Sequence, residues 1–339
     1  MTTDIRFLAI KDWLNRLNFN PVLDLESLAP ASSDASFRRY FRLQSRDRSS
    51  SYIVMDVPPS HEDTGPFVKV AELFAQSGVL VPEILAKDSQ AGFLLLSDLG
   101  HTTYLSELSE SSANSLYLDA NASLIKIQLS SKANVLPEYD TTLLSREMAL
   151  FPEWYLTRHL DIKLTNQQSQ QLQEVFAALL KNNLAQAQVY VHRDFHSRNL
   201  MVAPENNPGI LDFQDAVYGP ITYDLASLYR DAYIEWEEAQ QMDWLIRYWQ
   251  DAKKAGLPVS EDFGDFYRDF EWMGLQRHLK VLGIFARLFH RDGKDGYLKD
   301  IPLVFKYARK VAERYNAFKP LVHLFDQVEG IQRPDGLTF

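Results

Sequence analysis

Apolar residues recur near every 3.6 positions in several segments of the chain, which predicts amphipathic helices. The first runs from Ile5 to Leu17, and later helices are expected at residues 66–76, 116–129, 168–181, 223–233, 266–290 and 297–318. Shorter apolar runs, partly alternating with polar residues, predict strands within residues 32–43 and at 51–57, 79–85 and 92–96. Strands therefore belong to the first hundred residues and long helices to the rest. This order favours an α+β fold with a small β-rich N-terminal lobe and a larger helical C-terminal lobe.

Two further strand-like runs enclose the most specific motif. Val189-Tyr190-Val191 precedes His192-Arg193-Asp194, Asn199 follows five residues after Asp194, and Ile210-Leu211 precedes Asp212-Phe213. This is the protein-kinase pattern H-R-D-x-x-x-x-N followed by D-F. Phosphoryl transfer needs one carboxylate at the acceptor hydroxyl, and an amide oxygen and a second carboxylate that hold Mg²⁺ against ATP phosphates. The simpler alternative is a polar turn between two strands, because Asp and Asn suit turns.

Composition narrows the class of protein. The chain has 339 residues, 46% hydrophobic and 24% charged, which is typical of a globular protein large enough for two lobes. It has no cysteine, which excludes disulfides, thiolate metal sites and cysteine nucleophiles. Its net charge of −10 argues against nucleic-acid binding, so an anion such as ATP requires locally concentrated cations. The N-terminus lacks the pattern of a secretory signal and no apolar run reaches the roughly 18 residues of a membrane span, so we expect a cytoplasmic protein.

The candidate ATP-binding residues lie in the N-terminal lobe. The turn before the strand at 37–43 is a candidate phosphate-covering tip, with Ser33, Ala35 and Ser36 small enough for close backbone approach and Arg38 or Arg39 as cation. It contains no glycine, and an ordinary basic strand edge explains it equally well. Ser97 and Leu99 follow the strand at 92–96 and are the candidate hinge that meets adenine. We accordingly place the lobes at residues 1–97 and 98–339.

The candidate acceptor-binding residues lie in the helical lobe. Glu147 and Trp154 belong to a segment rich in carboxylates and aromatics that suits a sugar, although helix packing explains the aromatics as well. Asp224 either complements a helix N-terminus or braces the catalytic loop, and His192 is expected to orient that loop. A stripe of cations occupies one face of the helix expected at 266–290 and its continuation: Arg277, Lys280, Arg287, Arg291 and Lys294. A solvated surface is its usual meaning, and we favour it over a positive wall facing an anionic substrate.

Taken together, the chain resembles the aminoglycoside phosphotransferase family of kinase-like small-molecule kinases over nearly its whole length. The segments at residues 34–40, 55–56, 93–96, 150–155 and 272–278 are most similar to family members that phosphorylate the anomeric hydroxyl of N-acetylmuramate and N-acetylglucosamine in peptidoglycan recycling. The resemblance implies a two-lobed protein-kinase-like fold, ATP as co-substrate, and a small amino sugar as acceptor. It also implies Asp194 as catalytic base and Asn199 and Asp212 as Mg²⁺ ligands. We expect a monomer without nucleic-acid or membrane partners.

One feature departs from the kinase pattern. The strand at 52–56 ends in Asp56, where kinases place a phosphate-binding lysine, and Lys69 stands near the usual position of the partner glutamate. The two charges are therefore predicted to be exchanged, which leaves Arg38 or Arg39 for the phosphates. Two alternatives to an amino-sugar kinase stay open. One is a kinase of the same fold acting on an aminoglycoside, an amino alcohol or another sugar, and the other is a nucleotide-binding pseudokinase that binds a partner.

Overall fold

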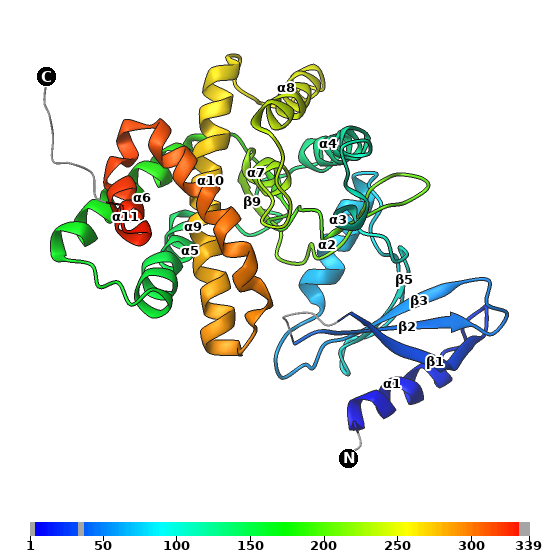
Figure 1. Ribbon diagram of the computed structural model, residues 1–339. Coiled ribbons are helices and arrows are strands. Elements are labelled where there is room, and N and C mark those ends of the chain that lie inside the picture. The colour runs from blue at the N-terminus through cyan, green and yellow to red at the C-terminus, as the bar shows by residue number, and fades with distance from the viewer. Residues whose placement is uncertain (1–3, 33–36, 332–339) are drawn as a thin grey trace, which may run out of the picture. The chain divides into compact units, whose positions relative to one another are not determined.

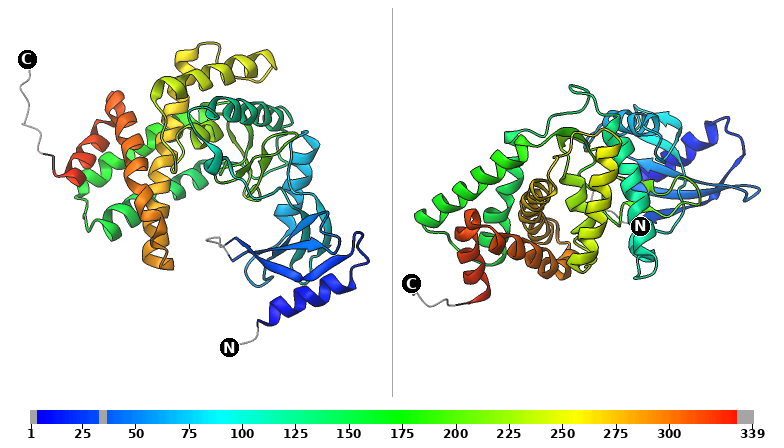
Figure 2. Two further views of the ribbon diagram at one scale, coloured as in Figure 1. Left: turned by 45° about the vertical axis from the view of Figure 1, so that its right-hand side comes forward. Right: turned by 90° about the horizontal axis from the view of Figure 1, so that it is seen from above.

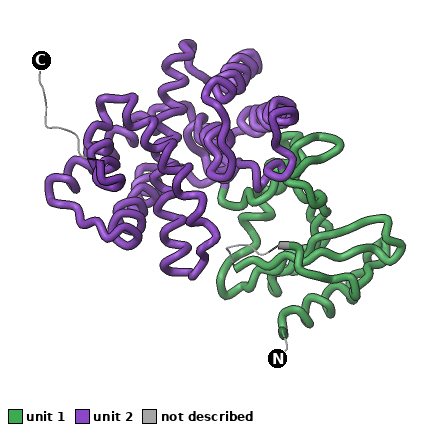
Figure 3. The backbone as a smooth tube through the Cα atoms, in the orientation of Figure 1, with its two compact units in different colours: residues 1–103, 200–215 green, residues 104–199, 216–339 purple. Residues whose placement is uncertain are grey.

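The computed structural model describes residues 4–32 and 37–331 (Figure 1). The chain folds into two compact units (Figure 3). The first comprises Met1–Thr103 together with Leu200–Asp215, and the second comprises Tyr104–Asn199 together with Ala216–Phe339. The first unit thus extends past Ser97, and it includes a segment from the middle of the sequence that sequence analysis assigned to the helical lobe.

An antiparallel sheet forms the centre of the first unit, in the order β1-β2-β3-β5-β4. Its strands are β1 (Leu23–Ser32), β2 (Arg39–Ser45), β3 (Ser51–Asp56), β4 (Ile84–Asp88) and β5 (Phe93–Ser97). Helix α1 (Ile5–Arg16) packs on the sheet through Ile10, Trp13 and Leu14. Phe93 and Leu95 share that cluster, whereas Leu94 and Leu96 alternate with them and are equally buried. Both faces of β5 are therefore covered, which explains its unbroken apolar sequence.

The turn expected at 32–37 lies mostly outside the described residues. Strand β2 pairs with both β1 and β3, and the turn at 46–50 joins β2 to β3. One strand prediction needs correction. The strand expected at 79–85 begins only at Ile84, since Pro82 cannot donate a hydrogen bond to a ladder. Leu80 instead accepts from the amide of Ile210 at 2.8 Å, next to the short pair β7 (Leu200–Met201) and β8 (Gly209–Ile210).

The second unit is mainly helical. Its helices are α3 (Tyr104–Glu107), α4 (Ala113–Leu129), α5 (Thr141–Met148), the π-helix η1 (Phe151–His159), α6 (Asn166–Ala185), α7 (Tyr223–Tyr229), α8 (Glu238–Lys254), α9 (Phe263–Asp292), α10 (Ile301–Arg314) and α11 (Lys319–Glu329). Strands β6 (Gln188–Val191) and β9 (Val217–Pro220) form an antiparallel pair. The helix expected at 297–318 is present as the shorter α10, which Pro302 begins, and 3₁₀ turns occupy Asp295–Asp300 and Asn316–Phe318 on either side of it.

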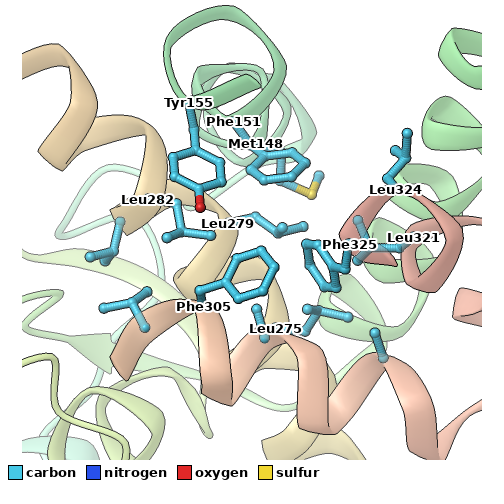
Figure 4. Close-up of a cluster of buried hydrophobic side chains, with 14 of the residues drawn as sticks. Met148, Phe151, Tyr155, Leu275, Leu279, Leu282, Phe305, Leu321, Leu324 and Phe325 are labelled. Carbon is cyan, nitrogen blue, oxygen red and sulfur yellow. The ribbon is translucent and has the colours of Figure 1, made fainter. Parts of the chain in front are cut away.

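Helix α9 is the central element of this unit and contacts α5, α6, α7, α10 and η1 (Figure 2). Leu275, Leu279 and Leu282 of α9 meet aromatic side chains from η1, α10 and α11 in one hydrophobic cluster (Figure 4). Gly283 of α9 permits a close approach of the backbone at Leu150, just before η1, because a Cβ at position 283 would lie 2.4 Å from the carbonyl carbon of Leu150. Among the described residues, no helix is both long and apolar enough to span a membrane.

Candidate active site

The loop after β6 carries the predicted catalytic residues. The amides of His192 and Arg193 donate to the Asp224 carboxylate at 2.7 and 3.0 Å. Asp224 is 1% exposed in the first turn of α7. Burial raises its pKa to about 7 against the effect of these two hydrogen bonds and of Arg277. Arg193 has a φ of 77°, which a non-glycine residue rarely adopts and which is typical of a functional loop held by its surroundings.

Asp194 is half-buried, and its backbone is fixed on both sides. Its amide donates to Nδ1 of His192 at 3.2 Å, so that ring nitrogen is the acceptor. Its carbonyl accepts from the His196 amide and from Nδ2 of Asn199, each at 3.0 Å. Burial alone would raise the pKa of the Asp194 carboxyl, but Lys280, His196, Arg193 and Arg277 outweigh it and lower that pKa below its ordinary value. Asp194 is therefore a carboxylate at neutral pH.

A second buried carboxylate, which sequence analysis missed, holds the far side of the loop. Asp231 is 1% exposed and accepts from the amide of Ser197 at 2.9 Å and from its hydroxyl. It also accepts from the amide of Tyr233 at 3.1 Å. Asp224 and Asp231 lie at either end of α7, so this one short helix supports both halves of the loop. The only sequence signal was the acidic residue that follows Arg230.

Glu147 lies inside a polar cluster whose members, Tyr139, Arg193 and Lys280, come from separate parts of the chain. Its carboxylate accepts from the hydroxyl of Tyr139 and pairs with Arg193, and Nζ of Lys280 lies 3.0 Å from its Oε1. Burial would raise the pKa of Glu147, but Lys280 and Arg193 lower it. The predicted substrate carboxylate is thus occupied by protein donors, and it positions Arg193 beside Asp194.

The other two predicted acceptor-binding residues differ in placement. Trp154 is partly buried, packs against the hydrophobic cluster of Figure 4, and lies under Arg158 at 4.5 Å. Arg277 is 3% exposed and Lys280 7%, so the solvated surface that we favoured is wrong for this part of the cation stripe. The cause is tertiary: the turn of α9 that carries them packs against α7. Arg291, at the helix end, is exposed as predicted.

In the first unit, Asp212 has a φ of 63°, which is again a rare conformation for a non-glycine residue. Gln214 donates to its Oδ1 at 2.8 Å, and Nη1 of Arg38 lies 3.5 Å from the same oxygen. Phe213 packs between Phe67 and Phe74, at ring distances of 4.9 and 5.9 Å. The motif's aspartate is therefore anchored by the aromatic residue that follows it.

The two predicted phosphate-side arginines have separate partners. Arg38 is 8% exposed and pairs with Glu62. Burial would lower the pKa of Arg38, but Glu62 and Asp212 hold it above its ordinary value. Arg39 pairs with Asp4 and with the fully buried Asp56, which Arg6 also binds. Arg6 and Arg39 thus supply the charge that the sequence led us to expect from Lys69. Ser33, Ala35 and Ser36 lie outside the described residues.

The predicted hinge is held by one carboxylate. Asp98, between Ser97 and Leu99, accepts from Arg42 at 2.6 and 2.9 Å, from the Ser51 hydroxyl at 2.7 Å, and from the Gly100 amide at 3.0 Å. Burial would raise the pKa of Asp98, but these donors lower it. Ser97 Oγ accepts from the Glu83 amide at 2.8 Å. The connector after β5 is therefore fixed to β2 and β3 through Asp98, which lies inside the predicted hinge but whose partners the sequence did not reveal.

Asn199 of the second unit and Asp212 of the first each carry a side-chain oxygen of the kind that Mg²⁺ binds. Over residues 4–32 and 37–331, no three His, Cys, Asp or Glu side chains gather as a metal site. Mg²⁺ commonly takes one or two protein oxygens and completes its shell with phosphates and water. Nδ2 of Asn199 donates to the carbonyl of Asp194, so Oδ1 is the ligand-type atom of this side chain, and the carboxylate of Asp212 is partly exposed. Both are suitable hard ligands.

Comparison with known proteins shows the family of the chain. Residues 27–263 match the phosphotransferase enzyme family. The chain belongs to this family. A relative from Neisseria meningitidis serogroup B, named N-acetylmuramate/N-acetylglucosamine kinase, is 48% identical over 339 residues, which cover 98% of this chain and 99% of that protein. A Pseudomonas aeruginosa relative of the same name is 49% identical over 322 residues, 93% of this chain and 94% of that protein.

Solved structures of phosphotransferases share the fold. Choline kinase LicA from Streptococcus pneumoniae aligns with a TM-score of 0.64 at 15% identity, over 89% of this chain and 98% of that one. An ADP-bound aminoglycoside phosphotransferase aligns with a TM-score of 0.57 at 14% identity, over 91% of this chain and 99% of that one. The expected protein-kinase-like fold, with a five-stranded sheet and a helical part, is confirmed.

Proposed function

We propose that this phosphotransferase moves the γ-phosphoryl group of ATP to the anomeric hydroxyl of N-acetylmuramate, N-acetylglucosamine or both. The product is the sugar 1-phosphate, and the process served is peptidoglycan recycling. The observation that carries the proposal is the near full-length identity of 48–49% to two kinases named for these sugars. The Asp194 loop, braced at both ends by α7, supports it.

Asp194 is the catalytic base in this proposal. Its lowered pKa keeps it ionised at neutral pH, so it can orient the anomeric hydroxyl and accept its proton as the phosphoryl group transfers. The transition state of phosphoryl transfer is loose, so positioning supplies much of the acceleration. Here Asp224, Asp231 and Glu147 supply it by fixing the loop and its arginine.

Nucleotide is assigned to residues of the first unit. Ser97 and Leu99 are proposed to offer backbone groups to adenine. Arg38 is favoured over Arg39 for the phosphates because Nη1 of Arg38 lies 3.5 Å from Oδ1 of Asp212, a proposed Mg²⁺ ligand, whereas Arg39 pairs with Asp4 and Asp56. Asn199 and Asp212 would hold Mg²⁺, which neutralises charge on the ATP phosphates when bound. We further propose that the protein is cytoplasmic.

Turnover with a panel of acceptors tests the function. ATP, Mg²⁺ and the two amino sugars should yield a product whose phosphorus NMR signal couples to the anomeric proton. Phosphate on another hydroxyl, or on an aminoglycoside or amino alcohol alone, would assign a different small-molecule kinase. No transfer to any acceptor would assign a nucleotide-binding pseudokinase.

The base is tested by Asp194→Asn. We expect kcat to fall about 100-fold or more while ATP binding persists, because the variant keeps the shape but cannot accept the proton. Asp243→Asn is the matched control, since that aspartate is about half exposed in a surface pair with Arg247. Near-normal turnover of Asp194→Asn would remove Asp194 from the base role.

A further inference from the structure

Arg277 carries a buried positive charge that no carboxylate of the described residues contacts directly. Its side chain is 3% exposed, and its Nη1 is buried with no hydrogen-bond partner among the described residues. Within the same part of the chain, no carboxylate lies within 4.0 Å of it. Burying a cation without a partner is costly, so such a residue is normally retained for an anion that arrives later.

The neighbouring cations lack this property, which makes Arg277 distinctive. Lys280, one turn further along α9, pairs with Glu147 and donates to the Tyr223 hydroxyl at 3.0 Å. Arg193 shares Glu147. Arg230, on the facing helix α7, pairs with Glu271 at 2.9 Å. Each of these charges already has an acidic partner, whereas that of Arg277 does not.

The position of Arg277 places this charge at the catalytic loop. Gly274 and His278 of the same α9 turn meet α7 at Ala226 and at the carbonyl of Arg230, and α7 carries the Asp224 that binds the loop. Arg277 also helps to lower the pKa of both Asp194 and His196. His196 is 9% exposed, and its Nδ1 is a second buried atom without a partner. The unpartnered Nη1 of Arg277 is a hydrogen-bond donor, so it indicates a ligand that supplies an acceptor.

We propose that Arg277 binds the lactyl carboxylate of N-acetylmuramate and sets the preference for muramate over N-acetylglucosamine. The inference rests on the proposed function and adds its specificity residue. The two sugars differ at C3, where muramate carries a lactyl ether and glucosamine a hydroxyl. C3 is two ring atoms from the reacting anomeric carbon, so a cation close to Asp194 is well placed for the carboxylate. A guanidinium also matches a carboxylate with two parallel hydrogen bonds.

The competing role for Arg277 is stabilisation of the transferring phosphoryl group. That role would affect both sugars equally, because the same group is transferred to each. The carboxylate role affects only the sugar that carries a carboxylate. The ratio of kcat/KM for the two sugars therefore separates the roles.

The experiment measures kcat/KM for both sugars in wild type, Arg277→Gln and Arg277→Lys. In Arg277→Gln we expect a loss of about 100-fold for N-acetylmuramate, because a charged hydrogen-bonded pair is removed, and less than about a 3-fold change for N-acetylglucosamine. Arg277→Lys keeps the charge and should recover part of the loss. Arg287→Gln is the matched control: it lies further along α9 with a buried Nε that also has no partner, but Arg291, Glu153 and Arg146 are its charged neighbours. It should leave the ratio unchanged.

A ligand-side measurement keeps the test decisive even if a variant at Arg277 fails to fold. Wild type is assayed with N-acetylmuramate and with its lactyl carboxamide, which differ only in the charge. We expect the amide to lose about as much kcat/KM as Arg277→Gln loses on the acid, and to lose little more in that variant.

Three results would overturn the assignment. They are equal losses on both sugars in a folded Arg277→Gln, a wild type indifferent to amidation, and an Arg287→Gln variant that changes the ratio. The proposed function fails in a different way, since wild type would then phosphorylate neither sugar at C1. The two failures are thus distinguishable.

Discussion

At the scale of single residues, this site depends on buried carboxylates that face backbone amides or cations. Asp224 accepts from two loop amides, Asp231 from three donors, and Glu147 from Tyr139 and two cations. Fully engaged acceptors of this kind hold a loop in a conformation that it would not adopt alone, as the positive φ of Arg193 shows. The pKa of Asp194, like that of Glu147, is lowered by surrounding cations against the effect of burial.

Asp224 gives the stability of the protein a pH dependence. Burial raises its pKa from 3.8 to about 7, so the folded protein binds this proton more tightly than the unfolded chain. The contribution of the protonated Asp224 carboxyl to the free energy of unfolding is therefore complete below pH 3.8 and is lost as the pH rises through 7. Thermal unfolding of wild type and Asp224→Asn between pH 5 and 8 should show the wild-type advantage shrinking, or its deficit growing, as pH rises.

Comparison with the variant removes the effects of other titrating groups, including the buried histidines. Asp243→Asn, which changes an exposed aspartate, should keep a constant offset from wild type over the same range. Parallel curves for wild type and Asp224→Asn would show that Asp224 does not titrate in this window.

The same scale shows what sequence can and cannot reveal. Asp194, Asn199 and Asp212 were identifiable because their spacing alone encodes their chemistry. In the sequence, the spacing of Arg277 and Lys280 is the same as that of a solvated stripe of cations. Only the packing of α9 on α7 shows that they are buried. Asp231 was missed for the same reason, and Glu147 was identified as a candidate but its partners Arg193 and Lys280 were not, since these are distant in the chain.

At the scale of elements, the connector after β5 depends on Asp98. The side chain of Asp98 is 2% exposed and accepts hydrogen bonds from Arg42, Ser51 and Gly100. Removing its carboxylate therefore leaves Arg42 without its acidic partner. We expect Asp98→Ala to lower the free energy of unfolding by about 3 kcal/mol. If Ser97 and Leu99 bind adenine, the KM for ATP should also rise.

The proper control is a double-mutant cycle with Arg42→Ala. The combined variant should lose less than the sum of the two single losses, because each single change removes the same interaction. Additive losses would mean that Arg42 and Asp98 do not stabilise each other. An unchanged KM for ATP in folded Asp98→Ala would contradict the hinge assignment.

The close contact between α9 and the start of η1 can be tested at Gly283. A Cβ at Gly283 would lie 2.4 Å from the Leu150 carbonyl carbon and 2.5 Å from its oxygen, and backbone cannot yield as a flexible side chain does. We expect Gly283→Ala to destabilise the protein by about 3 kcal/mol, measured by thermal or urea unfolding. Gly296→Ala is the matched control, because its Cβ would meet nothing within 4 Å. Equal stability of the two variants would show that α9 and η1 do not pack this closely.

Sequence periodicity found α9 but not this contact. Gly283 lies within a helix, where glycine is unfavourable by propensity, and the sequence does not say which neighbour requires it. The first strand, Leu23–Ser32, was missed because its polar residues and Pro30 obscure alternation. Local patterns thus located most elements, whereas the contacts among them came from tertiary packing.

At the scale of the whole molecule, the sequence predicts the two units to different extents. The second unit has long periodic helices, and sequence predicted several of them, including α4, α6 and α9, but not α8. The first unit includes Leu200–Asp215, which returns to it after the chain has formed β6 and the catalytic loop of the second unit. A division at residue 97 was the natural expectation from a linear sequence, because no pattern in residues 200–215 indicates the unit to which they belong.

The surface of the molecule predicts its state of association. Among the described residues, the exposed large hydrophobic side chains are Ile5, Leu8, Val22, Phe37, Leu129, Phe289 and Ile331, and only Ile5 and Leu8 share an element. A stable dimer typically buries about 1,200–2,000 Å² with an apolar centre, and side chains exposed singly do not provide one. We therefore expect a monomer, with light scattering after size exclusion giving a mass near 39.0 kDa at micromolar concentration. The same mass should persist with ATP and acceptor present, because the proposed chemistry draws every residue from one chain. A concentration-independent mass of twice this value would contradict the prediction and direct attention to α1, the one element with two exposed apolar side chains.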